Sequence, residues 1–448
     1  MNRIIRLPRG GLFLPSRKDN LRHSPVRNAS LPPLAIVPLV RADGQEISPL
    51  VQVGDKVHEG MPIGKGKGTY SSYIHAPIPG TVWDIRKIPL PIGIEAMAVF
   101  IELGGAFDRL GKKDVVFPWN GIPHRELKNQ LMEKGVLDPD FPMDGPIEIL
   151  IINGMELEPY LSATYRILVE RSNEILQGVR ILQKLLEPDR TIVVLEATAS
   201  EAQAALKGAL QFEPVQREGE NDRGIDLVSV EGKYPVDSKD QLIRIFSHRH
   251  SMPGNPGASP DIVVVDVSTT FAVYEGVALR KPWMERVITI GGNAIRHPAN
   301  LKVRIGTPIV DLIEECGGLV ESPVKVVSGG PLRGSGVFDL RTPVTKDTSG
   351  ILFLSREEIH SGVQTPCINC GKCIQVCPEG LHPAKLFKWI DHGLFEKALE
   401  ESLLNCTECG CCAFVCPSRI PLVQGLQVGK YHMDGKMNEK GRKETSRG

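Results

Sequence analysis

The hydrophobic and polar positions of this chain change their rhythm several times, most clearly in its middle third. There, short apolar runs typical of β-strands alternate with longer segments in which apolar residues recur every three or four positions. The apolar runs are 147–153, 190–197, 225–230 and 261–267. Because they are nearly continuous and are separated by helical segments, we expect a parallel sheet with both faces covered. The pattern therefore predicts an α/β domain over residues 112–284.

A different rhythm precedes this domain. Between Pro33 and Leu103, short apolar alternations are cut by glycine and proline turns, which predicts a small all-β unit over 31–105. Its sequence V-G-D-K-V, followed by H-A-P-x-P-G-T-V, resembles the barrel-sandwich hybrid of biotinyl and lipoyl carriers. The lysines between these halves, Lys65 and Lys67, lack the flanking residues of a carrier site. We therefore interpret the unit as structural.

Downstream of the α/β domain, short strands and glycine-rich turns surround one amphipathic segment from about Pro308 to Cys316. This combination predicts a compact β-grasp-like domain over 285–355. We interpret Cys316 as a small buried hydrophobe. The glycine turn 328–331 could cradle a phosphate, but no helix is predicted to follow it directly, as a phosphate loop would require.

The strongest chemical signal is a pair of cysteine runs near the C-terminus. Each run has the spacing C-x2-C-x2-C-x3-C-P. Three thiolates two residues apart can wrap one face of a 4Fe-4S cubane, and in two-cluster ferredoxins the fourth cysteine of each run ligates the other cluster. We therefore predict two clusters with crossed ligands. Cluster 1 would be held by Cys367, Cys370, Cys373 and Cys416, and cluster 2 by Cys406, Cys409, Cys412 and Cys377.

Other uses of these cysteines explain the pattern less well. Structural zinc takes four ligands, commonly two C-x2-C pairs, which leaves the third cysteine and the C-P ending of each run unexplained. Disulfides would require export, yet Met1 to Asn20 has no apolar stretch typical of a signal peptide. Eight thiols placed for iron instead predict a reducing compartment, most simply the cytoplasm. Cys411 could compete with Cys412 as a ligand, although the spacing favours Cys412.

The residues between the two runs predict the local architecture around the clusters. Apolar residues recur there at helical spacing and are interrupted at Asp391, His392 and Gly393, so we expect two short helices. This favours an α-helical two-cluster ferredoxin domain over 356–430, followed by a polar tail over 431–448. His382 and His392 are interpreted as surface or packing residues, because the cysteines complete both sites.

Composition narrows the function classes further. The chain has 448 residues, of which 41% are hydrophobic, and a formal net charge of +0. It carries no sustained basic stretch, so nothing indicates a nucleic-acid partner. No apolar run approaches the roughly 18 residues needed to cross a bilayer, so membrane association would come through a partner.

Taken in order, these segments resemble one family along almost the whole chain: the RnfC family, which belongs to the Rnf ion-translocating electron transport complex. The opening arm over 1–30 contains GGLFLPSRK, and the all-β unit contains VGDKV and HAPIPGTV. Further matches are NGMELEPY, ERVITIGGNAIRHPANLKVRIGTP, SGGPLRG with TSGILFLS, and the twin cysteine runs. The colinearity of these motifs makes the resemblance specific.

The resemblance implies a fold and an activity. The middle domain would be Rossmann-like and similar to the flavoprotein subunit of complex I, and the β-grasp unit would be an SLBB domain. In this family FMN accepts hydride from NADH, and single electrons pass through the clusters to integral membrane subunits and other redox subunits. The protein would lie peripherally on the cytoplasmic side of the membrane. Glu156 and Glu158 match the family's acids on the nucleotide and flavin side.

The chain departs from the family where the flavin phosphate would bind. The family carries a loop of the type G-x-G-G-A-G-F-P-T, whereas this chain reads EKGVLDPDFPMDGPIEIL and places Asp138 and Asp140 there. Side chains prevent close backbone approach, and carboxylates repel phosphate. Three hypotheses follow. The chain is an electron relay with another protein as its donor, or an active NADH-oxidising flavoprotein, or a standalone reductase similar to cobalamin reductases or a scaffold with structural clusters.

Overall fold

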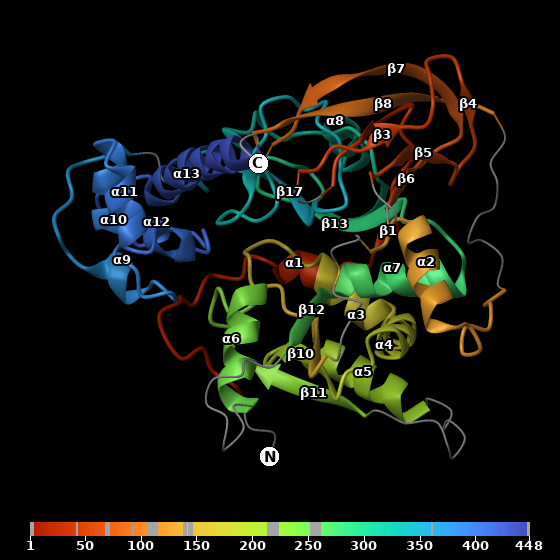
Figure 1. Ribbon diagram of the computed structural model, residues 1–448, viewed down its shortest axis with the longest axis horizontal. Helices are drawn as coiled ribbons and strands as arrows, with labels where there is room; N and C mark the ends of the chain where they lie inside the picture. Colours follow the sequence, from red (N-terminus) through yellow and green to blue (C-terminus); the bar gives the residue numbers. More distant parts are fainter. Residues whose placement is uncertain are drawn as a thin grey trace.

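A computed structural model describes residues 4–41, 44–67, 72–91, 93–105, 115–137, 141, 147–212, 224–250, 261–359 and 362–445. Its four sheets and its ferredoxin-like helices form separate regions of one molecule (Figure 1). Among the described residues, no helix combines the length and the apolarity required to cross a membrane.

The middle of the chain forms the predicted parallel sheet. Its order is β11-β10-β9-β12, and every neighbouring pair is parallel. The chain leaves β9 toward β10 and β11 on one side and returns to β12 on the other, so the topological switch point lies between β9 and β12. The strands are β9 (Ile149–Asn153), β10 (Arg190–Glu196), β11 (Ile225–Val230) and β12 (Ile262–Asp266).

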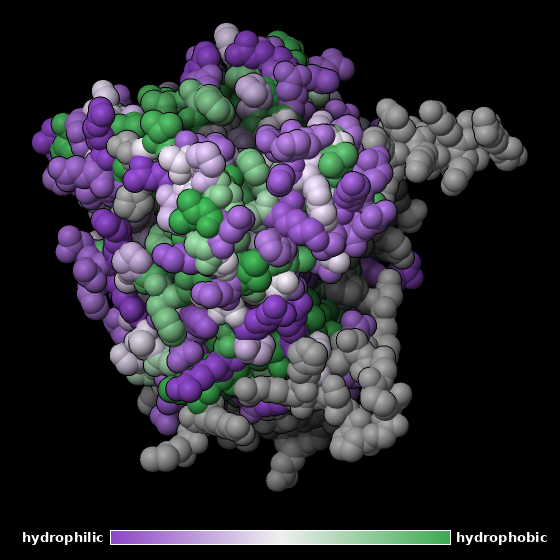
Figure 2. Space-filling model, turned by 90° about the vertical axis from the view of Figure 1, so that its left-hand side faces the viewer, coloured by the Kyte–Doolittle hydropathy of each residue, from purple (hydrophilic) through white to green (hydrophobic). Residues whose placement is uncertain are grey.

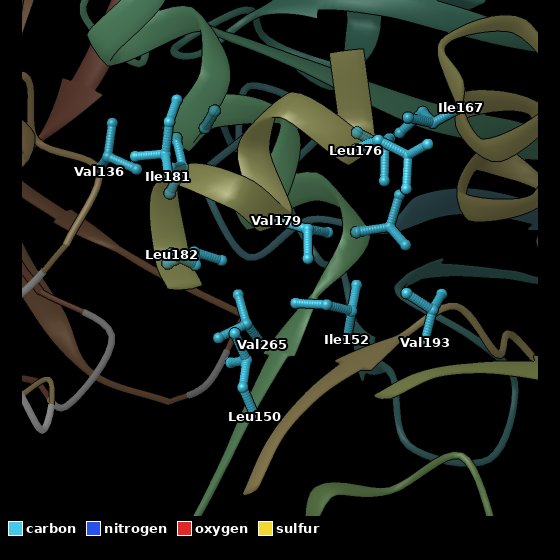
Figure 3. Close-up of a cluster of buried hydrophobic side chains, with 14 of the residues drawn as sticks. Val136, Leu150, Ile152, Ile167, Leu176, Val179, Ile181, Leu182, Val193 and Val265 are labelled. Atoms are coloured by element: carbon cyan, nitrogen blue, oxygen red, sulfur yellow. The ribbon is translucent and has the colours of Figure 1, made fainter. Parts of the chain in front are cut away.

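Both faces of this sheet are covered, but by different means. On one face, Leu150, Ile152 and Val193 pack under a layer of helices (Figure 3). On the other face, Ile151 packs with a single helix, α6 (Lys239–His250), and with residues of the N-terminal arm. The helices of the first layer are α2 (His124–Glu133), α3 (Ala163–Glu170), α4 (Ser172–Leu186), α5 (Ser200–Phe212) and α7 (Val267–Ala278).

The all-β unit is built from two sheets around one apolar core. The order of the larger sheet is β2-β8-β7-β4, and that of the smaller sheet is β3-β5-β6. The strands are β2 (Leu34–Pro38), β3 (Ser48–Pro49), β4 (Lys56–Val57), β5 (Pro62–Lys65), β6 (Tyr73–His75), β7 (Gly80–Pro89) and β8 (Glu95–Leu103).

A six-stranded sheet forms the predicted β-grasp-like domain, in the order β1-β14-β13-β17-β15-β16. The expected amphipathic helix is α8 (Ile309–Glu315), and Cys316 is fully buried beside it, as predicted. Strand β1 comes from the N-terminal arm and pairs with β14. The strands are β1 (Arg27–Asn28), β13 (Glu285–Gly291), β14 (Ala299–Arg304), β15 (Lys325–Ser328), β16 (Ser335–Gly336) and β17 (Gly350–Leu354).

The cysteine runs lie in a helical module with two helices between them, as the sequence pattern predicts. The last described helix, α13, continues to Thr445, so the expected boundary at residue 430 falls inside a helix and the described part of the polar tail is helical. The module comprises α9 (Lys372–Gln375), α10 (Pro383–Asp391), α11 (Phe395–Glu400), the 3-10 turn Leu403–Asn405, α12 (Cys411–Phe414) and α13 (Leu422–Thr445).

Within the N-terminal arm, residues 4–22 run between the helical module and the parallel sheet (Figure 1). Ile5 forms a parallel bridge with Val230, and the Gly11 N–H donates to the Val376 carbonyl over 2.9 Å. This part of the arm ends in a short helix, α1 (Asp19–Arg22), and β1 follows it. Segments that are far apart in sequence are thereby held together by the first residues of the chain.

Candidate iron-sulfur and cofactor sites

The first three cysteines of the second run and the last cysteine of the first run line one small cavity. Cys377 lines it together with Cys406, Cys409 and Cys412. These are the four residues that the crossed-ligand pattern assigns to cluster 2. Cys411 lines the same cavity and is fully buried, so the structure does not separate it from Cys412 by burial.

The four thiols around this cavity lie in a low-dielectric environment. Burial raises the pKa of Cys406 to about 11 and also raises the pKa of Cys377. Cys409 differs, because a hydrogen bond with the Cys411 thiol lowers its pKa to about 7. Iron binds thiolates, so the loss of thiol protons at this site would be coupled to cluster binding.

The remaining cysteines form a second, more open group. Cys367 and Cys370 are exposed, whereas Cys373 and Cys416 are half-buried and pack against the same apolar cluster around Leu422. Burial raises the pKa of Cys373, and the neighbouring Cys367 and Cys370 thiols raise it further. Thus the members of the predicted cluster 1 set also lie near one another.

The start of the first run is tied to the end of the second. The Ser418 hydroxyl donates to the Pro366 carbonyl over 2.9 Å, and the Thr365 N–H donates to the Ser418 carbonyl over 3.0 Å. Both contacts lie within two residues of Cys367 or Cys416. Figure 2 looks onto the side of the molecule that carries this module, where apolar and polar residues are interspersed.

Glu156, one of the two acids predicted on the cofactor side, caps a helix. Its carboxylate accepts a hydrogen bond of 3.1 Å from the Thr164 N–H in the first turn of α3. Lys18 of the N-terminal arm donates to the Glu156 backbone carbonyl. Burial raises the pKa of Glu156 and lowers the pKa of Lys18. Both residues line a cavity of about 190 Å³ at the carboxyl edge of the sheet.

Glu158, the second predicted acid, is buried and reaches into the β-grasp domain. It accepts hydrogen bonds from the backbone N–H groups of Leu332 and Arg333 over 3.0 and 3.1 Å, and from Arg333 Nε over 3.1 Å. A Cβ on Gly330 would lie 2.3 Å from the Glu158 carboxylate, so this position requires a residue without a side chain. The glycine turn considered as a phosphate cradle therefore holds a carboxylate of this chain.

A third acid, Asp266, was not singled out from the sequence. It ends β12 at the switch point and caps α7, accepting hydrogen bonds from the Thr269 N–H over 2.9 Å and the Thr269 hydroxyl over 2.8 Å. Its sequence signal was available, because an acid directly after an apolar strand and before a helix marks a helix N-cap. Asp266 lines a cavity of about 590 Å³, to which Lys239 and Lys346 also contribute.

The altered glycine loop lies largely outside the described residues, which include neither 138–140 nor 142–146. Gly135 at its start is described, with φ at +66°, and a Cβ there would lie 2.3 Å from the Tyr73 carbonyl oxygen. This glycine is therefore required for packing against the all-β unit.

Sequence models of protein families match four consecutive regions of the chain. They are described as the RnfC barrel sandwich hybrid domain (8–106), the Nuo51 FMN-binding domain (138–275), the SLBB domain (287–334) and the 4Fe-4S dicluster domain (366–420). The corresponding component of a proton-translocating ferredoxin:NAD(+) oxidoreductase complex from Clostridium ljungdahlii is 33% identical over 88% of this chain and 86% of its own. The chain belongs to the RnfC family.

A second RnfC relative agrees with this assignment. The corresponding component of an ion-translocating oxidoreductase complex from Rhodobacter capsulatus is 32% identical over 96% of this chain and 83% of its own. A crystal structure of an NAD+-reducing [NiFe]-hydrogenase has a TM-score of 0.44 at 14% identity, covering 68% of this chain and 61% of that chain. The family membership and the four domain matches confirm the expected fold class and the expected role in electron transfer.

Proposed function

We propose that this RnfC protein relays single electrons through two 4Fe-4S clusters, between a soluble donor and membrane subunits, without a flavin of its own. It would act peripherally at the cytoplasmic side of the membrane. The observation that carries the proposal is that three groups of backbone N–H donors near the carboxyl edge of the parallel sheet are already bonded to carboxylates of this chain.

Each of these N–H groups is a natural position for a phosphate. Helix N-termini and glycine turns bind anions because their amides are unpaired and their dipoles favour negative charge. Here Glu156 bonds to the first turn of α3, Asp266 to the first turn of α7, and Glu158 to the turn after Gly330. A phosphate would have to displace a carboxylate or lie beside one. At these three positions of the described chain, the residues present do not fit the phosphate of FMN or NADH.

The cysteine sets, in contrast, fit the clusters. We assign Cys367, Cys370, Cys373 and Cys416 to cluster 1 and Cys406, Cys409, Cys412 and Cys377 to cluster 2. When bound, such clusters supply one-electron transfer. In the second set Cys377 and Cys412 are buried and Cys406 and Cys409 are half-buried, whereas Cys367 and Cys370 of the first set are exposed. We therefore expect cluster 1 to exchange electrons with a partner protein and cluster 2 to face the parallel-sheet domain.

A second candidate function is an NADH-oxidising flavoprotein. Two observations favour it: the match to an FMN-binding domain over 138–275, and the cavity of about 590 Å³ beside the switch point, whose lining includes lysines. Under this alternative Glu156 would contact the cofactor from the carboxyl edge of the sheet.

Anaerobic purification separates the two functions. The relay predicts about eight iron atoms per chain, no stoichiometric flavin, and clusters that dithionite bleaches but NADH does not. Stoichiometric FMN together with bleaching by NADH would instead establish the flavoprotein. If dithionite produced no reduced-cluster EPR signal, electron transfer by either route would be excluded.

Isolation from membranes tests the partners. A component of an Rnf-type complex should co-purify with integral membrane subunits after mild detergent extraction. Recovery of a fully active reductase without any membrane subunit would favour the standalone enzyme.

A further inference from the structure

One tyrosine joins the cluster 2 cysteines to the parallel-sheet domain. Tyr234 is fully buried, and its hydroxyl lies 2.5 Å from the Cys409 carbonyl oxygen and 3.2 Å from Glu158 Oε1. A hydroxyl has a single hydrogen to donate. The shorter distance assigns that hydrogen to the Cys409 carbonyl, so the tyrosine is bonded to the backbone of a predicted cluster ligand.

The backbone of Tyr234 is fixed by the same arm that holds the other predicted ligand segment. Leu12 exchanges two hydrogen bonds with Tyr234, of 2.7 and 2.8 Å. The adjacent Gly11 donates to the carbonyl of Val376, and a Cβ on Gly10 would lie 2.6 Å from the Cys377 carbonyl oxygen. Tyr234 is therefore held in register with both Cys377 and Cys409.

Charged residues surround the tyrosine in a closed arrangement. The Arg333 guanidinium lies 5.1 Å from the centre of the Tyr234 ring. It pairs with Glu158 over 3.1 Å and with Asp237 over 2.6 Å. Both acids are buried, so their charges are weakly screened, whereas the Arg333 side chain is 31% exposed.

We propose that Tyr234 is a positioning residue for cluster 2 and raises the reduction potential of this cluster. This inference rests on the proposed function, in which cysteines 377, 406, 409 and 412 hold cluster 2. Reduction adds negative charge to a cluster. Hydrogen-bond donation to the Cys409 carbonyl offsets the negative end of a peptide dipole beside that charge, and thereby favours the reduced state.

Potentiometric EPR titration of the full chain with both clusters tests this role. In Tyr234→Phe the ring remains but the hydroxyl is lost. We expect one signal to become harder to reduce by about tenfold in its one-electron equilibrium, which is about 59 mV, while the other signal is unchanged. Tyr431→Phe is the matched control, because Tyr431 is exposed on α13, and it should shift neither signal.

A charge variant should shift the reduction potential of cluster 2 in the opposite direction. Glu158→Gln removes a buried negative charge near Cys409, so the same signal should become easier to reduce. If Tyr234→Phe assembles both clusters and leaves the potential unchanged, or if both signals move together in each variant, the role of Tyr234 is refuted. If Tyr234→Phe fails to assemble cluster 2, Glu158→Gln decides alone, and an unchanged potential there refutes the proposal.

Failure of this inference is distinguishable from failure of the proposed function. A wild-type chain that binds no reducible clusters contradicts the relay before any variant is compared. Two reducible clusters with unaltered potentials in the variants contradict only the role of Tyr234.

Discussion

At the residue scale, burial does not show whether Cys411 or Cys412 is the ligand of cluster 2, because both line the cavity. The spacing of the run assigns Cys412 as the ligand. We predict that Cys411→Ala keeps about eight iron atoms per chain and both EPR signals, whereas Cys412→Ala falls to about four. Retention of both clusters in Cys412→Ala, with loss in Cys411→Ala, would reverse the assignment.

Gly330 is a second residue whose identity follows from one contact. A methyl group there would lie 2.3 Å from the Glu158 carboxylate. Gly330→Ala should therefore displace this carboxylate and break the hydrogen bonds that it accepts from backbone N–H groups. Leaving these buried groups unpaired should lower the free energy of unfolding by about 1–3 kcal/mol. Chemical denaturation measures the change.

The control for Gly330→Ala is Gly336→Ala. A Cβ on Gly336 has no neighbouring atom within 4 Å. This variant should remain within about 0.5 kcal/mol of the wild type. Equal destabilisation by both substitutions would contradict the role assigned to the Glu158 contact.

At the scale of single elements, Asp266 stabilises the start of α7. Asp266→Ala removes the side-chain acceptor of the Thr269 N–H and should lower the free energy of unfolding by about 0.5–2 kcal/mol. Asp266→Asn keeps an oxygen acceptor and should be nearly neutral. Thermal and denaturant unfolding compare the pair, and equal stability of the two variants would show that the cap contributes nothing.

Elements with strong local periodicity could be predicted from the sequence. The continuous apolar runs at 149–153 and 262–266 specify buried parallel strands, and the break at Gly393 separates two helices as expected. Their hydrophobic pattern and their turns are determined by neighbouring residues, so these features can be predicted without knowledge of tertiary contacts.

Features made by long-range contacts could not be predicted in the same way. Nothing local to Lys18 indicates that it reaches Glu156, and nothing near Glu158 indicates that it accepts from the Leu332 N–H. The cysteine pattern predicts the ligand sets because one cubane constrains all of its ligands together. No shared ligand constrains Glu156 and Glu158, so their hydrogen-bond partners can be identified only from the structure.

At the scale of the whole molecule, a buried ion network joins three domains. Glu285 of β13 pairs with Lys281 and Lys302, and its neighbour Arg304 pairs with Glu59 of the all-β unit. Burial alone would raise the pKa of Glu285, but the surrounding positive charges hold it well below its usual range. Proton binding to Glu285 is therefore opposed in the folded state.

The low folded pKa of Glu285 makes the stability of the protein depend on pH. An unfolded glutamate has a pKa of about 4.3, so Glu285 stabilises the folded chain above that value and loses this contribution as the pH falls toward its lower folded pKa. We predict that the stability difference between the wild type and Glu285→Gln is largest near pH 7 and shrinks below about pH 5. Glu95→Gln, at an exposed position, is the control and should show no such trend.

The N-terminal arm also affects the order in which this molecule can be completed. Residues 5–12 are synthesised early, yet their partners Val230, Tyr234 and Val376 emerge from the ribosome hundreds of residues later. Docking of the arm can therefore be completed only after the cysteine module has formed, because one of its hydrogen-bond partners belongs to that module. The complete set of arm contacts therefore forms late, and only in a chain whose cysteine module is already folded.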